Sequence, residues 1–405
     1  MGQRLLLATG TSGMRETSWG RTMAELPTYF NDFLSRIRLT EEQVAELKDA
    51  HTTLRQRLEA DQDLSKILVS TFLQGSYRRA TIIRPAEGMR ADVDVIVVTN
   101  LDRHAVTPQQ AMGKFRGFLD THYRGKWKYQ GRSIGIELKT VDLDLVVTSA
   151  PSEVDQKALR FDSVRSATTL EEARDLRFNE FWVPPERRDS IEATSRMFKA
   201  SKEADWKTEP LWIPDRDAKD WQQTHPLEQL RWTRDKNART EGHFVNVVKA
   251  LKWWRRLKDP EAEHPKSYPL ERIFGECCPD ITCSIACGVT ETLERIVIDF
   301  ESFATAGTVP VLCDHGIPQD VLKRVSGEDF GRFYKQAKAA AVIAREALDE
   351  KDKSKSASRW RDLFGEEFPP PPEEGGGSDG TKGGGTPGGY SERGGPSTVG
   401  SGRFA

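Results

Sequence analysis

The sequence predicts an α+β protein in which a mixed sheet with helices is followed by a mostly helical C-terminal lobe. Two runs rich in β-branched residues, Asp92–Val98 and Val141–Val147, are typical of buried strands. Apolar residues at helical spacing from Thr240 to Lys258 predict a helix with one buried face. Because the strands come first and the long helices later, we expect the two kinds of structure to form separate parts.

The region before the first strand run is predicted to be helical. A capping box at Thr40–Gln43 begins a helix whose apolar residues continue at helical spacing to Leu58. A second helix is expected over Leu64–Leu73, and it runs directly into a glycine–serine turn at Gln74–Ser76. The other expected elements are helices over Pro108–His122, Leu270–Cys287 and Phe330–Leu348 and a strand over Ser133–Leu138.

The chain divides into five predicted segments. With 405 residues it is long enough for two domains. Residues 1–39 form an N-terminal extension, 40–151 a core with the strands, and 152–220 a connecting or lid segment. Residues 221–365 form the helical lobe, and 366–405 form a tail rich in proline and glycine. Because the tail has too few apolar residues to form a core, we expect it to be disordered.

The overall charge argues against a nucleic-acid partner. The 60 lysines and arginines nearly balance the 62 aspartates and glutamates, whereas proteins that follow a nucleic-acid backbone need a strongly basic surface. One local basic stripe leaves an RNA substrate open as an alternative, with a solvated charged helix face as the favoured interpretation. The stripe consists of Arg231, Arg234, Lys236 and Arg239.

The sequence gives no sign of membrane insertion or export. No segment has the roughly 20 consecutive apolar residues that a membrane span needs, and the run Leu5–Leu7 is too short for a secretory signal. We therefore expect a cytoplasmic protein without a membrane partner. The five cysteines are an odd number, which in such a chain favours reduced thiols over disulfides.

Four of the cysteines lie close together in the sequence. They are Cys277, Cys278, Cys283 and Cys287. Their spacing is not that of two paired zinc knuckles, and apolar residues stand between them as in a buried helix. Buried thiols are therefore favoured, and a metal site is the alternative.

Carboxylates at period-two spacing are the first sign of chemistry. Residues i and i+2 of a strand face the same side, so Asp92 and Asp94 place their oxygens in one space. Nucleotidyl transfer needs two divalent cations about 3.5–4 Å apart, held by bridging carboxylates. The later strand offers Asp142 or Asp144 as the third carboxylate. Asp144 is favoured because a continuous apolar run follows it.

The glycine–serine turn supplies the matching phosphate site. Gly75 lets the backbone approach a phosphate closely, and the Ser76 hydroxyl and the adjacent amides can donate to phosphate oxygens. The turn and the two aspartates together form a much rarer pattern than either alone. The pattern favours a two-metal nucleotidyltransferase.

The segment from Gln74 to Thr81, followed by Asp92–Asp94, resembles the signature of the CD-NTases. These are cyclic GMP-AMP synthase-like bacterial nucleotidyltransferases of anti-phage CBASS systems, within the DNA polymerase β superfamily. The resemblance implies a polymerase β-like core with the active site in the cleft between it and the helical lobe. Ala80 departs from the family pattern, which has glycine there, and Val147 stands where a proline is usual.

The resemblance extends into the helical lobe and implies further nucleotide-binding residues. The stretch from His243 to Lys252 resembles the helix whose lysine reaches the triphosphate, which assigns that role to Lys249. Ser267 and Tyr268 resemble a serine that contacts phosphate and a tyrosine that stacks on a base. Gln74, Gly75 and Ser76 complete the implied nucleotide site.

The activity that the resemblance implies is synthesis of a cyclic di- or trinucleotide second messenger from ATP, with or without GTP. Two Mg²⁺ ions, for which Mn²⁺ can substitute, would be held by Asp92, Asp94 and Asp144. Relatives with a similar helical lobe often make trinucleotides, so cyclic AMP-AMP-GMP is the product we expect. A solubilising terminus is the favoured interpretation of the C-terminal tail, and an operon-encoded regulator or a conjugating enzyme that acts on it is the partner that the resemblance implies as the alternative.

Two other classes of function remain as alternatives. A linear nucleotidyltransferase acting on RNA or on a small acceptor would use the same carboxylates. An inactive nucleotide-binding or scaffold protein is disfavoured because all three carboxylates are present.

Overall fold

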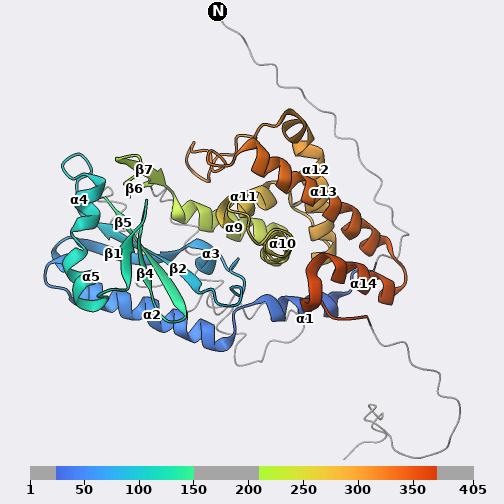
Figure 1. Cartoon of the computed structure of the whole chain (residues 1–405), viewed down its shortest axis with the longest axis horizontal. Coiled ribbons are helices and arrows are strands. Elements are labelled where there is room, and N and C mark those ends of the chain that lie inside the picture. The colour runs from blue at the N-terminus through green and yellow to red at the C-terminus, as the bar shows by residue number, and fades with distance from the viewer. Residues whose placement is uncertain (1–23, 150–208, 372–405) are drawn as a thin grey trace, which may run out of the picture. The chain divides into compact units, whose positions relative to one another are not determined.

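A five-stranded mixed sheet forms the centre of the N-terminal part of the protein (Figure 1). The computed structural model describes residues 24–149 and 209–371. The strands lie in the order β1-β2-β5-β4-β3; β2 and β5 are parallel, and the other neighbours are antiparallel. Their bounds are Leu68–Gln74 for β1, Ala91–Thr99 for β2, Trp127–Tyr129 for β3, Ile134–Glu137 for β4 and Val141–Thr148 for β5.

The two faces of the sheet are covered by different elements. Three valines of β2 pack on one face with leucines of α2 (Glu41–Ala60), which runs along the sheet in Figure 1. This helix begins at the predicted capping box, and both of its reciprocal hydrogen bonds at Thr40 are formed. On the other face, Ile96 and Val98 pack with Leu211. The alternation of the β2 side chains therefore fixes which face carries the carboxylates.

The prediction of a helix over Leu64–Leu73 is wrong. Only one 3₁₀ turn forms there, η1 (Leu64–Lys66), and the remainder is strand β1. That strand contains Val69 and Thr71, which suit a pleated sheet, and it pairs antiparallel with β2. Tertiary pairing decides the structure of a segment whose local apolar spacing also fits a helix. The glycine–serine turn therefore follows a strand.

Other elements of the sheet part are close to expectation but not identical. The helix expected over Pro108–His122 is interrupted and forms α4 (Pro108–Gly113) and α5 (Arg116–His122). A hairpin of β6 (Leu211–Asp215) and β7 (Asp220–Thr224) forms in the segment expected to be a connection. The predicted strands over 133–138 and 141–147 match β4 and β5 to within one residue at each end.

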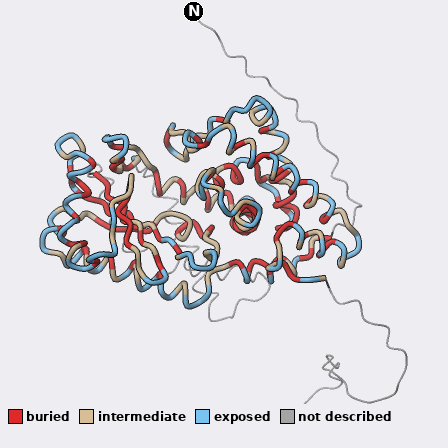
Figure 2. The backbone as a smooth tube through the Cα atoms, viewed as in Figure 1, coloured by how far each residue is buried: buried red, intermediate tan, exposed pale blue. Residues whose placement is uncertain are grey.

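The C-terminal part of the described chain is helical. Its elements are α9 (Pro226–Arg239), α10 (Phe244–Lys258), α11 (Ser267–Cys277), α12 (Ile285–Ala306), α13 (Gly327–Asp349), α14 (Lys353–Phe364) and the 3₁₀ turn η2 (Gly365–Glu367). The helix α1 (Pro27–Ile37) joins this part, because Phe30 and Phe33 pack against Phe364 and Phe368. Figure 2 shows buried residues both in the sheet and in these helices.

Two predicted helices of this part have different bounds in the structure. The helix expected from Thr240 begins at Phe244 because Glu241 and Gly242 have positive φ angles of 54° and 94°, which break the helix. The helix expected over 270–287 is split, since α11 ends at Cys277 and α12 begins after Ser284. The Ser284 hydroxyl caps α12 and accepts a hydrogen bond from the amide of Cys287 at 3.2 Å.

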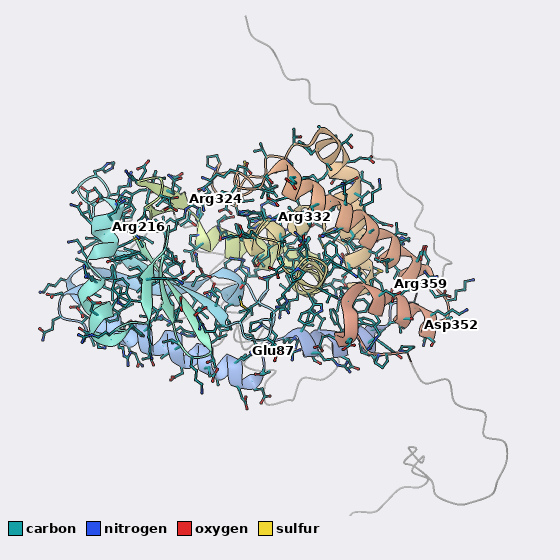
Figure 3. The ribbon with its side chains drawn as sticks, in the orientation of Figure 1. Glu87, Arg216, Arg324, Arg332, Asp352 and Arg359 are labelled. Atoms are coloured by element: carbon teal, nitrogen blue, oxygen red, sulfur yellow. A yellow bond between two sulfur atoms is a disulfide. The ribbon has the colours of Figure 1, made fainter. Side chains whose placement is uncertain are left out.

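Charged side chains of both signs project from the described part (Figure 3). Arg332 pairs with Asp329, and Arg359 pairs with Glu346. None of the helices in the described ranges combines the length and hydrophobicity that a membrane span requires. Most of the predicted connecting segment, from 152 to 208, and the tail beyond 371 lie outside the described residues.

Candidate active site

The register of β2 and β5 brings the predicted carboxylates together. Asp92 lies opposite Asp142 and Asp94 lies opposite Asp144 in this parallel pair. One carboxylate oxygen from each of Asp92, Asp94 and Asp144 lies within 4.8 Å of the others. Asp142 instead accepts a hydrogen bond from Arg90 Nε at 2.7 Å. Of the two candidates for the third carboxylate, Asp144 is therefore the one that faces the pair on β2.

The protein environment raises the pKa of all three carboxyl groups. Loss of surrounding water and then the neighbouring carboxylates raise the pKa of Asp92 to about 8. The same causes raise the pKa of Asp94 to about 6, although the nearby Arg79 opposes the shift. Desolvation also raises the pKa of Asp144, against hydrogen bonds from Ser133 and Gln130. A bound cation would relieve this repulsion, so the cluster is electrostatically suited to metal ions.

The glycine of the predicted turn lies directly against one of these carboxylates. Gln74, the last residue of β1, is the register partner of Asp94. Gly75 follows with φ +78°, and a β-carbon at this position would stand 1.7 Å from Asp94 Oδ2. Only glycine, which has no β-carbon, fits both the positive φ angle and this close approach of the carboxylate. The turn and the carboxylates therefore form one site.

The turn after Gly75 is closed by its own backbone. It continues as the one-turn helix α3 (Gly75–Arg78), and the Ser76 carbonyl accepts hydrogen bonds from the amides of Thr81 and Ile82 at 2.9 and 3.1 Å. Ala80 has a left-handed φ of 56°. This left-handed conformation is one that glycine adopts without strain and that alanine adopts only at a cost.

A buried carboxylate of α11 links this turn to the helical part. Glu271 accepts from Arg79 Nε at 3.0 Å and from Lys252 Nζ at 3.1 Å, and Ser267 Oγ lies 3.4 Å from it. Lys252 also donates to the Thr81 carbonyl at 3.0 Å. Burial alone would raise the pKa of Glu271, but Arg79 and Lys252 hold it down at about 2. Glu271 is therefore an ionised anchor for two cations.

Tyr268 is held on two sides. The Arg79 guanidinium lies over its ring at 4.7 Å, and its hydroxyl donates to Asp314. Asp314 also accepts from Gln229 Nε2 at 2.8 Å and from the His315 amide at 2.7 Å. These contacts together fix the orientation of the Tyr268 ring.

Comparisons with known proteins agree with this geometry. A family model for the Second Messenger Oligonucleotide or Dinucleotide Synthetase domain matches residues 24–150. A probable cyclic AMP-AMP-GMP nucleotide synthase from Salmonella paratyphi B is 44% identical over 352 residues, covering 85% of this chain and 92% of that protein. The chain belongs to the CD-NTase family. A cyclic AMP-AMP-GMP synthase from Enterobacter hormaechei subsp. hoffmannii is 42% identical, with the same coverage.

Solved CD-NTase structures share the fold. The CdnG enzyme of Bradyrhizobium diazoefficiens, in complex with GTP, aligns with a TM-score of 0.58 at 13% identity over 84% of this chain and 95% of that one. CdnC of E. coli MS115-1, in complex with a HORMA protein, aligns with a TM-score of 0.56 at 16% identity over 86% and 99%. The predicted α+β fold with a helical C-terminal part is thus confirmed.

Membership in the CD-NTases confirms the expected class of activity. The chain is a nucleotidyltransferase that synthesises a cyclic oligonucleotide. The family is metal-dependent, and the acidic triad is present.

Some residues around the CD-NTase site were not predicted from the sequence. Lys249, the predicted phosphate ligand, is 1% exposed within α10. Lys252, three residues further along α10, contacts the segment after the turn. The same three-residue spacing places both lysines on one face of the helix, which is the only sequence signal for Lys252. Arg79 and Glu271 are 192 residues apart, so no local pattern connects them.

The basic stripe that kept RNA open as a substrate is neutralised in the structure. Arg231 pairs with Glu228, and Arg234 pairs with Asp235. Lys236 and Arg239 both pair with Asp280. The favoured interpretation, a solvated charged helix face, fits the three arginines but not Lys236, which is buried. Charges paired in this way fit a surface that binds phosphates less well.

Proposed function

We propose that this CD-NTase joins ATP and GTP into cyclic AMP-AMP-GMP with release of pyrophosphate. The two relatives at 44% and 42% identity carry this product in their names. The convergence of Asp92, Asp94 and Asp144 within 4.8 Å is the observation that carries the proposal. A chain that kept the fold without these carboxylates would lack the means for nucleotidyl transfer.

The donor set fits hard divalent cations. Each of the three aspartates offers a carboxylate oxygen, the ligand type that Mg²⁺ and Mn²⁺ prefer. Bound there, two such ions would neutralise the triphosphate charge and lower the pKa of the acceptor hydroxyl. Asp92, Asp94 and Asp144 would hold these ions.

The remaining residues of the proposed site bind and orient the substrates. Asp144 helps to remove the proton of the attacking hydroxyl. The amides after Gly75 and the Ser76 hydroxyl hold the triphosphate, with Lys249 stabilising the pyrophosphate that leaves after in-line attack on the α-phosphate. Ser267 contacts phosphate and Tyr268 stacks on a base. Three rounds of this reaction, the last of which joins the two ends of the linear trinucleotide, form the ring and release one pyrophosphate per bond.

The proposal is tested by identifying the products. Purified protein is incubated with labelled ribonucleoside triphosphates and Mg²⁺, treated with phosphatase, and analysed by mass. We expect a phosphatase-resistant cyclic AMP-AMP-GMP that disappears with a chelator, returns with Mg²⁺ or Mn²⁺, and is absent from the Asp92→Ala, Asp94→Ala double variant. Pyrophosphate release only when RNA or a small acceptor is added would show a linear transferase instead.

We also propose that the product acts in anti-phage defence, and that a regulator or conjugating enzyme acts on the C-terminal tail. CdnC, one of the structural neighbours, is in complex with a HORMA protein. Plaque counts on cells with the complete operon should rise when Asp92 and Asp94 are replaced. Equal conjugate formation by full-length and tail-truncated chains would contradict the role of the tail.

A further inference from the structure

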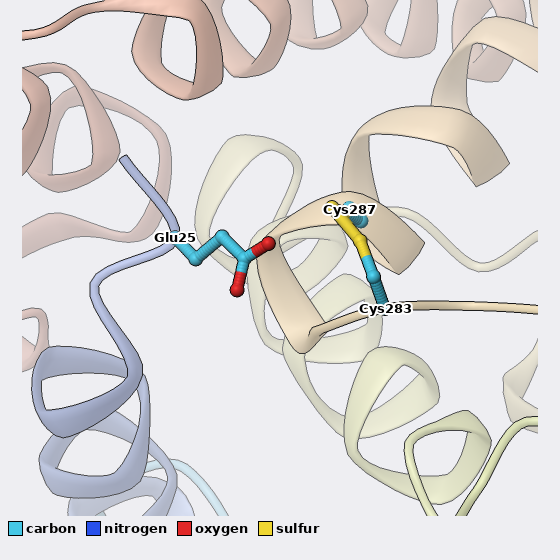
Figure 4. A group of neighbouring side chains, drawn as sticks. All are labelled: Glu25, Cys283 and Cys287. Carbon is cyan, nitrogen blue, oxygen red and sulfur yellow. A yellow bond between two sulfur atoms is a disulfide. The ribbon is translucent and has the colours of Figure 1, made fainter. Parts of the chain in front are cut away.

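A second group of metal-ligating side chains lies outside the active site, where α12 begins. Glu25 stands just before α1, Cys283 precedes the cap of α12, and Cys287 lies in its first turn (Figure 4). One carboxylate oxygen and the two sulfur atoms lie within 4.8 Å of one another. The cysteines form a disulfide with their Cα atoms 6.2 Å apart, which overturns the expectation of reduced thiols for this pair.

Local structure explains why the three side chains meet. Cys283 and Cys287 are four residues apart across the start of a helix, so one turn brings their side chains to the same face. The backbone beside Glu25 is tied to the helical part, because the Ala24 amide donates to the Leu348 carbonyl at 3.1 Å. Phe30 of the following helix is 1% exposed in the same core.

A cavity adjoins the group. It has a volume of about 730 Å³, and its wall includes Glu25, Cys283 and Asn246. Asn246 is 6% exposed, and its Oδ1 has no hydrogen-bond partner among the described residues. Cys283 is exposed, whereas Cys287 is buried. The group thus has both a route from solvent and space for a further small ligand.

We propose that the reduced Cys283 and Cys287, together with Glu25, bind a Zn²⁺ ion whose fourth position is taken by a water from this cavity. Two thiolates and one carboxylate form a donor set typical of zinc and unlike the all-oxygen set of the active site. The N-terminal end of α12, a helix of 22 residues, stabilises the negative charge of both thiolates. The site therefore selects a different metal from the catalytic carboxylates.

The disulfide and the zinc site are alternative states of the same sulfur atoms. Two equivalents of a small thiol reduce the disulfide and are themselves joined into one external disulfide, leaving two cysteine thiols. Binding of Zn²⁺ then forms two Zn–S bonds and releases the two thiol protons. Metal occupancy protects the cysteines from oxidation, and the oxidised protein does not bind zinc here.

Co²⁺ is the probe that separates this site from the active site. Thiolate ligation of Co²⁺ gives a sulfur-to-metal charge-transfer band in the near ultraviolet, which carboxylate ligands do not give. We expect the reduced, metal-free protein to develop this band with one Co²⁺ per chain, and one equivalent of Zn²⁺ to abolish it. The protein with an intact disulfide should show no band.

Substitution of each proposed ligand tests whether that side chain binds the metal ion. Cys283→Ser and Cys287→Ser should each lose the band, and Glu25→Gln should weaken Co²⁺ binding at least tenfold. Cys313→Ser is the control, because Cys313 is an exposed free thiol outside the group. Circular dichroism of each variant checks that it is folded. A band that is absent from the reduced protein, or that survives both cysteine substitutions, would overturn the proposal, and neither outcome bears on the Asp92 and Asp94 variants.

Discussion

The carboxylate of Asp94 occupies the space that a side chain at Gly75 would need. A β-carbon at Gly75 would lie 1.7 Å from Asp94 Oδ2 and 2.8 Å from its Cγ. Gly75→Ala should therefore push the Asp94 carboxylate out of the proposed metal site. We expect the rate of cyclic nucleotide synthesis to fall by about 100-fold or more, because displacing a catalytic group by about 1 Å can lower a rate by that factor.

A matched control separates this clash from backbone strain. Gly88 has φ +76°, close to the value at Gly75, but a β-carbon there would meet no atom within 4 Å. Gly88→Ala should therefore retain nearly full activity with a small loss of stability. Equal loss of activity in both variants would attribute the effect to strain in the backbone and contradict the role of the close approach.

The two aspartates of β5 should respond differently to substitution. Asp144 faces Asp92 and Asp94, whereas Asp142 binds Arg90. We expect Asp144→Asn to reduce kcat by about 100- to 1,000-fold, because metal-assisted charge stabilisation contributes several kcal/mol. Asp142→Asn should keep most of the activity. Initial rates of pyrophosphate release at saturating Mg²⁺ test this, and the reverse order of effects would exchange the two assignments.

Glu271→Gln should destabilise the protein in a pH-dependent way. Removing one partner of a buried ion pair costs about 3–5 kcal/mol. The pKa of Glu271 is lowered from 4.5 to about 2. A carboxylate with a lowered folded-state pKa stabilises the protein above pH 4.5 and loses that contribution as the pH falls towards 2. The gap in unfolding free energy between wild type and variant should therefore be full at pH 7 and narrow below pH 4.5.

Urea unfolding across this pH range measures the gap, and Glu276→Gln is the control. Glu276 pairs with Arg272 at 2.9 Å, but its side chain is 53% exposed. An exposed pair contributes at most about 1 kcal/mol. A gap for Glu271→Gln that stayed constant down to pH 3 would mean that its charge is not the stabilising feature.

Substitutions of Tyr268 should separate its ring from its hydroxyl. Tyr268→Phe keeps the ring under Arg79 and loses the hydrogen bond to Asp314, so we expect a loss of about 1 kcal/mol in stability and little change in KM. Tyr268→Ala removes the proposed stacking surface, and KM for a triphosphate should rise by about 5- to 100-fold. Steady-state kinetics of both variants provide the test. A similar KM for both would argue against base stacking.

The sequence predicts the parts of the site that depend on local geometry. The period-two spacing of Asp92 and Asp94 places them on one face of any strand, and Gly75 is a recognisable turn residue. The strand before that turn was not predicted, because the spacing of apolar residues in 64–73 fits both a helix and a strand until β2 pairs with it.

Long-range contacts could not be predicted in the same way. The contact of Arg79 with Glu271 depends on how α11 packs against the turn. The disulfide between Cys283 and Cys287 depends on the start of α12 at Ile285, which brings the two sulfur atoms together. The number of cysteines and the expected cellular compartment give no information on that position. The apolar run after Asp144 favours it over Asp142 in the sequence, but the hydrogen bond that Asp142 accepts from Arg90 could not be predicted.

The ion pairs of Glu271 have a consequence for how one cluster of three aspartates can form every bond of a cyclic nucleotide. Its single buried side chain binds both Arg79, which follows the glycine–serine turn, and Lys252, which belongs to the helical part. Opening the protein at this point between two rounds of bond formation would separate charges in a dry environment, at a cost of several kcal/mol. We therefore expect the contact between the sheet part and the helical part at Glu271 to persist while the linear intermediate changes its orientation in the active site.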